Sequence, residues 1–150
     1  MRTQFSVAED GVRMARARLE DLGGLTRIQA QALRVAGVRN LDELREAARQ
    51  PTGRRELAKR SGVEENTVLE AALQADLCRV AGVGPDTADL LYRAGVRTVT
   101  DLGRLEASDL AKRCLASLPE RKRRRTRMPS VGALHRWITR AHSLPPGIES

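Results

Sequence analysis

Residues 77–91 read LCRVAGVGPDTADLL, and this stretch decides the fold. Apolar side chains precede the tripeptide Gly82-Val83-Gly84, and Pro85 follows it. Proline is well tolerated at the first position of a helix, because the N–H that it lacks would have no partner there. The stretch therefore predicts a helix, a tight glycine turn, and a second helix over residues 85–94.

A related stretch lies 58 residues earlier, where residues 19–33 read LEDLGGLTRIQAQAL. The same offset pairs AGVRNLDEL (36–44) with AGVRTVTDL (94–102). Self-similarity at a fixed offset indicates two copies of one structural unit. The first copy keeps Gly24 but has Thr26 in place of the second glycine, so its turn is expected to fold without the same anion-binding geometry.

Capping signals set the helix boundaries in both copies. Gly37 and Gly95 are typical C-terminal stops, and Asn40 and the Thr98 to Asp101 segment are typical helix starts. Apolar periodicity predicts further helices over residues 6–22, 53–60, 64–80, 107–117 and 130–142, with no strand. We expect an all-α fold of two pseudo-repeated, five-helix-like units, residues 1–75 and 76–145, followed by a tail at 146–150.

The composition excludes several classes of protein. The chain has 150 residues, enough to bury a core without a disulfide or metal. Cys78 and Cys114 stand far apart with no paired spacing, so neither a zinc nor an iron–sulfur site is expected, and a reducing cytoplasm is the expected location. No window approaches 18 uninterrupted apolar residues, so no membrane partner is expected.

The net charge of +8 is concentrated in the last third of the chain. Residues 1–111 contain 17 basic and 17 acidic side chains. Residues 112–142 contain one acidic side chain, Glu120, and ten basic ones: Lys112, Arg113, Arg121, Lys122, Arg123, Arg124, Arg125, Arg127, Arg136 and Arg140. Such an excess favours an anionic partner.

Six of the seven positions from Arg121 to Arg127 are basic. Pro119 and Pro129 bracket this run and predict a nonhelical basic loop over residues 119–129. Closely spaced positive charges repel one another, so we interpret the run as a phosphate-binding loop. The alternatives are a solvated loop and a contact with an acidic protein surface.

Residues 77–91 fit the helix-hairpin-helix pattern, apolar-x-x-apolar-x-Gly-apolar-Gly-x-x-x-Ala-x-x-apolar, at every specified position. Together with GRRELAKRSGVEENTVLEAALQADLCRVAGVG (53–84) and RMPSVGALHRWITRAHSLP (127–145), they make the chain resemble the tandem helix-hairpin-helix family catalogued as domain of unknown function 4332. The resemblance runs from about residue 18 to 145. It implies an all-α pair of five-helix units and nucleic-acid binding, and it supplies no established reaction.

Amides exposed at a glycine turn and a helix start can bind phosphate. Asp86 and Asp89 oppose this reading at the second turn, because carboxylates in the first turns of a helix repel anions. The candidate nucleic-acid-binding residues are Gly82, Val83, Gly84, Thr87 and Arg79 at the second turn, Gly24 and Arg27 at the first, and Arg121, Lys122, Arg123, Arg124, Arg125, Arg127 and Arg140 in the basic region.

Other features of the sequence have ordinary structural explanations. Trp137 and Ile138, with Val131, Leu134 and Ala141, follow helical spacing and are expected in the core, and Cys78 is expected to be a small buried hydrophobe. His135 and His142 lack a neighbouring carboxylate or thiol, so no metal site is expected. No catalytic motif, cofactor site or small-molecule substrate is indicated.

The sequence therefore predicts a non-catalytic protein that contacts duplex DNA phosphates without strong sequence specificity. A protein-interaction adaptor or self-assembling module, whose basic loop docks an acidic partner, is the alternative from another class, and the balanced charge of residues 1–111 favours it. An accessory subunit of a larger nucleic-acid enzyme is a third possibility. DNA and RNA are not distinguished by the sequence.

Overall fold

The structure, a computed structural model, describes residues 17–123 and 125–149, and every regular element in these ranges is helical. The elements are the 3-10 helix η1 (Leu19–Asp21) and the α-helices α2 (Arg27–Val35), α3 (Leu41–Ala47), α4 (Pro51–Ser61), α5 (Glu65–Leu77), α6 (Pro85–Arg93), α7 (Val99–Gly103), α8 (Ala107–Ser117), α9 (Glu120–Arg123) and α10 (Val131–His142). The expected all-α class is confirmed for this part of the chain.

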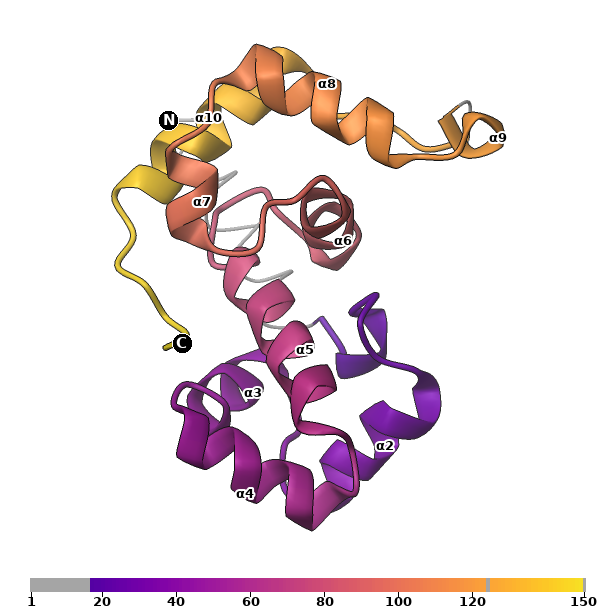
Figure 1. Ribbon diagram of the computed structural model, residues 1–150, viewed down its shortest axis with the longest axis vertical. Coiled ribbons are helices and arrows are strands. Elements are labelled where there is room, and N and C mark those ends of the chain that lie inside the picture. Colours follow the sequence, from indigo (N-terminus) through magenta and orange to yellow (C-terminus); the bar gives the residue numbers. More distant parts are fainter. Residues whose placement is uncertain (1–16, 124, 150) are drawn as a thin grey trace.

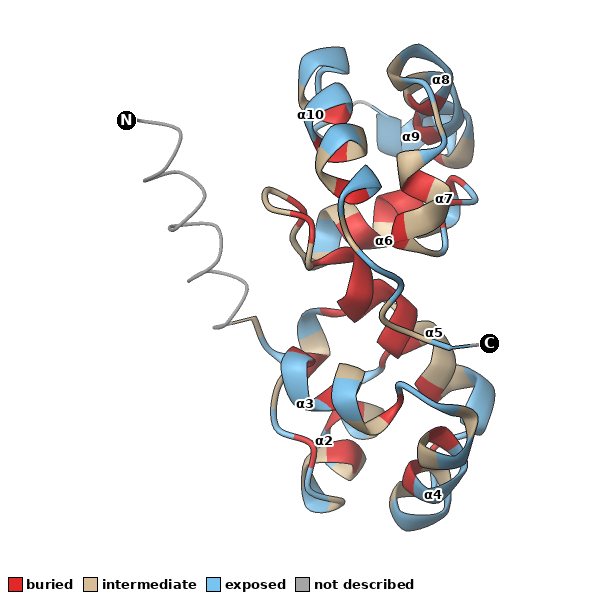
Figure 2. Ribbon diagram, turned by 90° about the vertical axis from the view of Figure 1, so that its left-hand side faces the viewer, coloured by how far each residue is buried: buried red, intermediate tan, exposed pale blue. Residues whose placement is uncertain are grey.

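Helix α5 runs through the centre of the molecule, between a group formed by α2, α3 and α4 and a group formed by α6, α7, α8 and α10 (Figure 1). It contacts α3 and α4 on one side and α6 on the other. All seven residues from Ala71 to Leu77 are buried, so the second half of α5 is enclosed on every side (Figure 2). A helix that is enclosed on every side is a core helix, not a surface helix.

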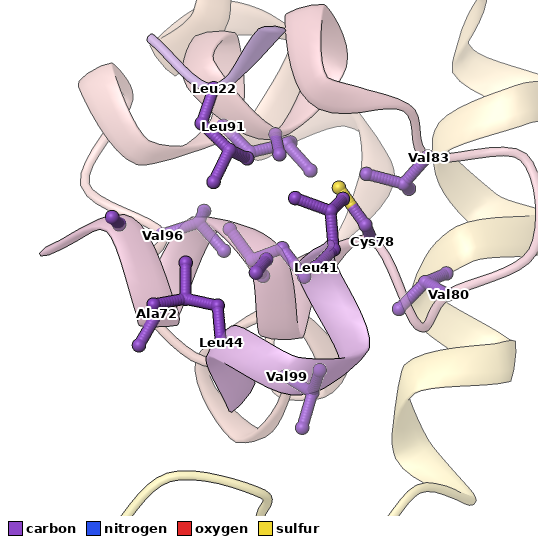
Figure 3. Close-up of a cluster of buried hydrophobic side chains, with 14 of the residues drawn as sticks. Leu22, Leu41, Leu44, Ala72, Cys78, Val80, Val83, Leu91, Val96 and Val99 are labelled. Atoms are coloured by element: carbon purple, nitrogen blue, oxygen red, sulfur yellow. The ribbon is translucent and has the colours of Figure 1, made fainter. Parts of the chain in front are cut away.

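The buried apolar side chains form one cluster that draws on both groups of helices. Leu41 and Leu44 of α3 lie in it together with Leu91, Val96 and Val99 from the second group (Figure 3). The boundary expected between residues 75 and 76 falls inside α5.

Helices α2 and α6 both have nine residues and begin 58 residues apart, at Arg27 and Pro85. Both are followed by a glycine with positive φ, 102° at Gly37 and 94° at Gly95, a conformation that favours glycine at a helix end. The predicted stops of both helices are confirmed.

The next helix in each group also begins as predicted. Oγ1 of Thr98 accepts from the backbone N–H of Asp101 at 3.0 Å, and the Asp101 carboxylate accepts from the N–H of Thr98 at 3.3 Å. The Asn40 side chain likewise accepts from the N–H of Glu43, at 2.8 Å. These bonds satisfy amides that the first turn of a helix leaves without partners.

The prediction of a nonhelical connector over residues 119–129 is wrong in its first part, because Glu120–Arg123 form α9. The carbonyl oxygen of Pro119 accepts from the N–H groups of Lys122 and Arg123, at 2.8 and 3.2 Å. A proline before a helix contributes only a carbonyl there, and that acceptor starts the turn. Residues 127–130 carry no regular structure, as expected.

The helix predicted over residues 6–22 lies outside the described residues up to residue 16. In the remaining part, Leu19–Asp21 form a 3-10 turn instead of an α-helix, with the N–H of Leu22 bonded to the carbonyl oxygen of Leu19 at 3.1 Å. Gly23 and Gly24 follow after Leu22 and are poor helix formers, so the turn does not extend.

Among the apolar residues predicted in α10, Leu134, Trp137 and Ala141 are buried and Ile138 packs against the core. Val131 is 53% exposed, so that part of the prediction is wrong. Val131 is the first residue of α10, and the helix reaches the core only one turn later.

The chain after α10 returns to the first group of helices and ends beside α3 (Figure 1). The N–H of Glu149 donates to the carbonyl oxygen of Arg49 at 2.8 Å, and Arg79 donates to the carbonyl oxygen of Pro145 at 2.7 Å. The tail therefore ties the two groups of helices together.

Candidate functional site

A cavity of about 720 Å³ lies between the start of α6, the segment after α9 and the first half of α10. It unites residues about 40 positions apart in the sequence. Its walls combine basic, hydroxyl, carboxylate and apolar side chains: Asp86, Thr87, Leu90, Arg125, Thr126, Arg127, Met128, Pro129, Ser130, Ala133 and Trp137.

The glycine turn before α6 allows α10 to approach this cavity closely. Gly82 has a φ of 96°, which L side chains rarely adopt. A Cβ atom there would also lie 2.6 Å from Nε1 of Trp137. Gly84 differs, because its φ of −94° and ψ of 179° are extended backbone that any residue adopts. Only the first glycine of the pair is required by its own backbone conformation.

The N-terminus of α6 has unpaired amides. Gly84 is the N-cap residue and supplies no side chain, and Pro85 has no N–H. The N–H groups of Gly84, Asp86 and Thr87 have no acceptor among the described residues, whereas that of Val83 donates to the carbonyl oxygen of Val80 at 2.9 Å. Amides of this kind, together with the positive end of the helix dipole, favour an anion.

Two residues of the basic run, Arg125 and Arg127, line the same cavity and are exposed. Arg121 and Lys122 are exposed on α9, which lies at the outer end of α8 (Figure 1). Within the described ranges, none of these four side chains is in a salt bridge. Arg124 lies outside the described residues.

Arg123 has a different position from its neighbours in the run. Its Nε donates to the carbonyl oxygens of Leu115 and Leu118, at 3.1 and 3.2 Å. It therefore caps the C-terminal end of α8, where carbonyl groups lack partners. This bonding assigns Arg123 a structural contact, although its side chain is exposed.

Arg79, predicted to assist the turn, and Arg140, predicted to add charge to the basic region, do not line the cavity. Arg79 forms a salt bridge with the buried Asp76, with Nε 2.6 Å from Oδ1. Arg140 donates from Nη1 to the carbonyl oxygen of Ala81 at 2.5 Å. Both guanidinium groups hold the backbone around the turn in place.

The two carboxylates that oppose phosphate binding are separated by the fold. Asp86 is exposed and lines the cavity. Asp89 instead accepts from Nε of Arg93 at 3.0 Å and faces Gly23, so closely that a Cβ on that glycine would clash with it. Of the two carboxylates, only that of Asp86 is placed to repel an anion in the cavity.

The turn before α2 differs from the turn before α6 in how its backbone N–H groups are bonded. The N–H of Gly24 donates to Oε1 of Gln74 at 2.9 Å, and Thr26 and Gln29 cap each other reciprocally. Gly24 also lacks a positive φ. Arg27 is exposed beside this turn, and neither it nor Gly24 lines the cavity.

The two cysteines are free and buried. Burial raises the pKa of the Cys78 thiol to about 12 and raises the pKa of the Cys114 thiol as well. The residues that the structure describes contain no cluster of three or more metal-ligating side chains. None of their helices has the length and apolar character needed to cross a bilayer.

Sequence reasoning missed the apolar and hydroxyl walls of the cavity, formed by Leu90, Thr126, Met128, Ser130 and Ala133. The local signal for this segment was the helix start at Ser130, whose Oγ accepts from the N–H of Ala133 at 3.1 Å. It locates the start of α10 but not the helix that α10 faces.

A family model described as Domain of unknown function (DUF4332) matches residues 23–144. Comparison with curated proteins and with solved structures gave no significant match.

Proposed function

The chain belongs to the family described as Domain of unknown function (DUF4332), and we propose that it binds nucleic acid through backbone phosphates. The proposed ligand is duplex DNA, bound without strong sequence specificity and without catalysis. The observation that carries the proposal is the meeting of Arg125 and Arg127 with the first turn of α6, at Asp86 and Thr87, in one cavity, which Gly82, Val83 and Gly84 do not line. Two independent anion-binding features, distant in the sequence, converge there.

The positive charge of the basic run, two members of which line the cavity, supports the proposal. Arg121, Lys122, Arg125 and Arg127 are exposed and form no salt bridge within the described residues. Contacts from these residues to phosphates would position a duplex without reading its sequence. The buried, free thiols suit a reducing cytoplasm, which we propose as the compartment.

We further propose that residues 19–47 and 77–103 are two copies of a helix-hairpin-helix unit. The equal lengths of α2 and α6, and the starts of α3 and α7 at Leu41 and Val99, support a common origin. In the second copy the N–H groups of Gly84 and Thr87 have no acceptor among the described residues, whereas the N–H groups of Thr26 and Gln29, at the equivalent positions of the first copy, are bonded to each other's side chains. We therefore assign phosphate contact to the second copy.

The test is a fluorescence anisotropy titration with labelled duplex DNA, single-stranded DNA and duplex RNA at several salt concentrations. About four phosphate contacts predict that log K falls with log salt at a slope of roughly −3 to −4. The variant Arg121→Gln, Lys122→Gln, Arg125→Gln, Arg127→Gln should lose most of the affinity and most of the slope.

A matched control removes the same net charge elsewhere, from Arg39, Arg55, Lys59 and Arg104, which are exposed and stand away from the cavity. Changing these four to Gln should leave binding within about twofold of wild type, since local contacts and not total charge hold the phosphates. Equal losses in the two variants would contradict the proposed site. No binding to any of the three nucleic acids at low salt would contradict the function.

One observation favours the second candidate, a protein-interaction adaptor or self-assembling module. Ile28 and Val35 are 82% and 81% exposed, and they lie seven residues apart on one side of α2. Exposed apolar side chains on one helix face are typical of contacts between proteins. Analytical ultracentrifugation over a wide concentration range, for wild type and for the double variant Ile28→Ser, Val35→Ser, tests self-assembly. If both proteins sediment with the mass of a monomer at every concentration, self-assembly through this face is contradicted.

A further inference from the structure

We propose that the cavity between α6 and α10 receives a single unpaired nucleotide of a bound nucleic acid, with its base inside and its phosphate at Arg125 and Arg127. This inference rests on the proposed function, because it uses two of the same phosphate contacts, Arg125 and Arg127. It adds a preference for strand ends or gaps over continuous duplex.

The size of the cavity is the first argument. Contact with a phosphate of a duplex requires only a rim of donors, and the volume here is about 720 Å³. Pockets that enclose small ligands have volumes of roughly 300 to 1,000 Å³. The hollow therefore has room for a base and its sugar beyond the phosphate.

The walls are the second argument. Leu90 and Trp137 are buried and Met128 is half-buried, and together they give the cavity an apolar interior. Arg125 and Arg127 supply the positive charge. Apolar walls with a few polar groups and a cationic side fit a base that carries a phosphate.

Asp86 gives the third argument, because a site that bound only phosphate would not favour a carboxylate at this position. Its carboxylate is exposed at the cavity and forms no salt bridge within the described residues, and it would repel a phosphate bound at the start of α6. A carboxylate accepts hydrogen bonds from exocyclic amino groups, as of cytosine N4. Thymine has no such group. Asp86 therefore selects bases that carry an amino group.

The nucleotide must be unpaired for a steric reason. A paired base has neighbours on both faces and its Watson–Crick edge occupied, so it cannot enter a cavity between two helices. The free energy of exposing a base is smallest where it is already single-stranded. Overhangs and gaps therefore satisfy the requirement without unpairing.

The experiment compares three DNAs of one duplex sequence: a dumbbell whose two ends are closed by non-nucleotide linkers, so that it has no ends and no unpaired base, the duplex with a two-nucleotide dC overhang, and the duplex with a two-nucleotide dT overhang. We expect wild type to bind the dC overhang about tenfold more tightly than the dumbbell, a value within the range of single-base contacts. The dT overhang should bind less tightly than the dC overhang. Each overhang is tested in two separate substrates, one with a 5′ overhang and one with a 3′ overhang.

Two variants locate the effect. Ala133→Phe fills the cavity without changing the charge, so this variant should bind all three DNAs with the affinity that wild type has for the dumbbell. Ala116→Phe, at an exposed position of α8, is the control and should retain the preference for the dC overhang. Asp86→Asn, at an exposed position, should bind the dumbbell at least as tightly as wild type and lose the discrimination between dC and dT.

The outcomes separate this inference from the proposed function. Equal affinity for the dumbbell and both overhangs, at either strand end, overturns the nucleotide site and leaves phosphate binding intact. Absence of binding to all three overturns the proposed function. Free dCMP that binds as tightly as the dC overhang in calorimetry would also overturn the inference, because the ligand would then be a mononucleotide.

Discussion

Trp137 packs against Gly82 so closely that a Cβ atom on the glycine would lie 2.6 Å from Nε1 of the indole. The contact joins α10 to the turn before α6, and Arg140 adds a hydrogen bond to the carbonyl oxygen of Ala81. The cavity lies between these same two helices. Its shape therefore depends on a glycine that does not line it.

Gly82→Ala is expected to destabilise the protein by about 2 to 4 kcal/mol, because strain at a φ of 96° adds to the clash with Trp137. Gly95→Ala is the matched control, since its φ is 94° and the nearest atom to a new Cβ is Nη1 of Arg113 at 3.9 Å. Urea unfolding of both variants measures the difference. Equal losses in the free energy of unfolding would mean that the clash between the new Cβ and Trp137 adds nothing to the cost of the substitution.

Local signals predicted much of the fold. Pro85 and Gly95 gave the bounds of α6, the Thr98 to Asp101 capping box gave the start of α7, and α8 covers residues 107–117 as expected. These signals act within four residues of one another, so the sequence displays them directly.

The candidate site was predicted only in its parts. Thr87 and Arg125 were both candidates, but nothing within either segment indicates that they share a cavity. That meeting depends on the packing of α10 against α7 and α8, which sets the path of residues 125–130. The contacts of Arg79 were not predictable for a similar reason, because one of its acceptors, the carbonyl oxygen of Pro145, is 66 residues away.

Arg123 and Arg121 should have separable effects although they are neighbours in one basic run. Arg123→Gln removes the donor to the carbonyl oxygens of Leu115 and Leu118 and should cost about 0.5 to 1.5 kcal/mol of stability. Arg121→Gln should leave the urea midpoint unchanged and weaken duplex binding. Chemical denaturation and anisotropy on the two single variants test this. An unchanged midpoint for Arg123→Gln would contradict its assignment as a cap.

The Asp76–Arg79 salt bridge should matter more for stability than a salt bridge whose carboxylate is exposed. Asp76 is 2% exposed, and its partner also holds the tail through Pro145. Asp76→Ala leaves a partly buried guanidinium without its anion, and a loss of about 3 kcal/mol is expected. Asp42→Ala removes a carboxylate that is 70% exposed, although its partner Arg45 is half-buried, and should cost less than about 1 kcal/mol. Thermal and urea unfolding compare the two, and similar losses would refute the distinction.

Cys78 should be unreactive in the folded protein. Burial raises the pKa of its thiol to about 12, so the thiolate that attacks alkylating reagents is nearly absent at pH 8. Iodoacetamide should therefore label Cys78 only after unfolding in urea. Rapid labelling of Cys78 without denaturant, read by peptide mass spectrometry, would show that its surroundings open on the time scale of the assay.

The same pKa predicts how stability depends on pH. The unfolded chain releases the Cys78 proton near pH 8.5 to 9, whereas the folded chain keeps it up to about pH 12. Between these values the folded state binds more protons, so the free energy of unfolding falls as pH rises, by at most about 1.4 kcal/mol per pH unit. Below pH 8 the thiol contributes no slope. Cys78→Ala removes this titration, and its stability should therefore fall less steeply than that of wild type between pH 9 and pH 11 in urea unfolding. Parallel profiles would mean that the thiol is no harder to ionise in the folded chain than in the unfolded one.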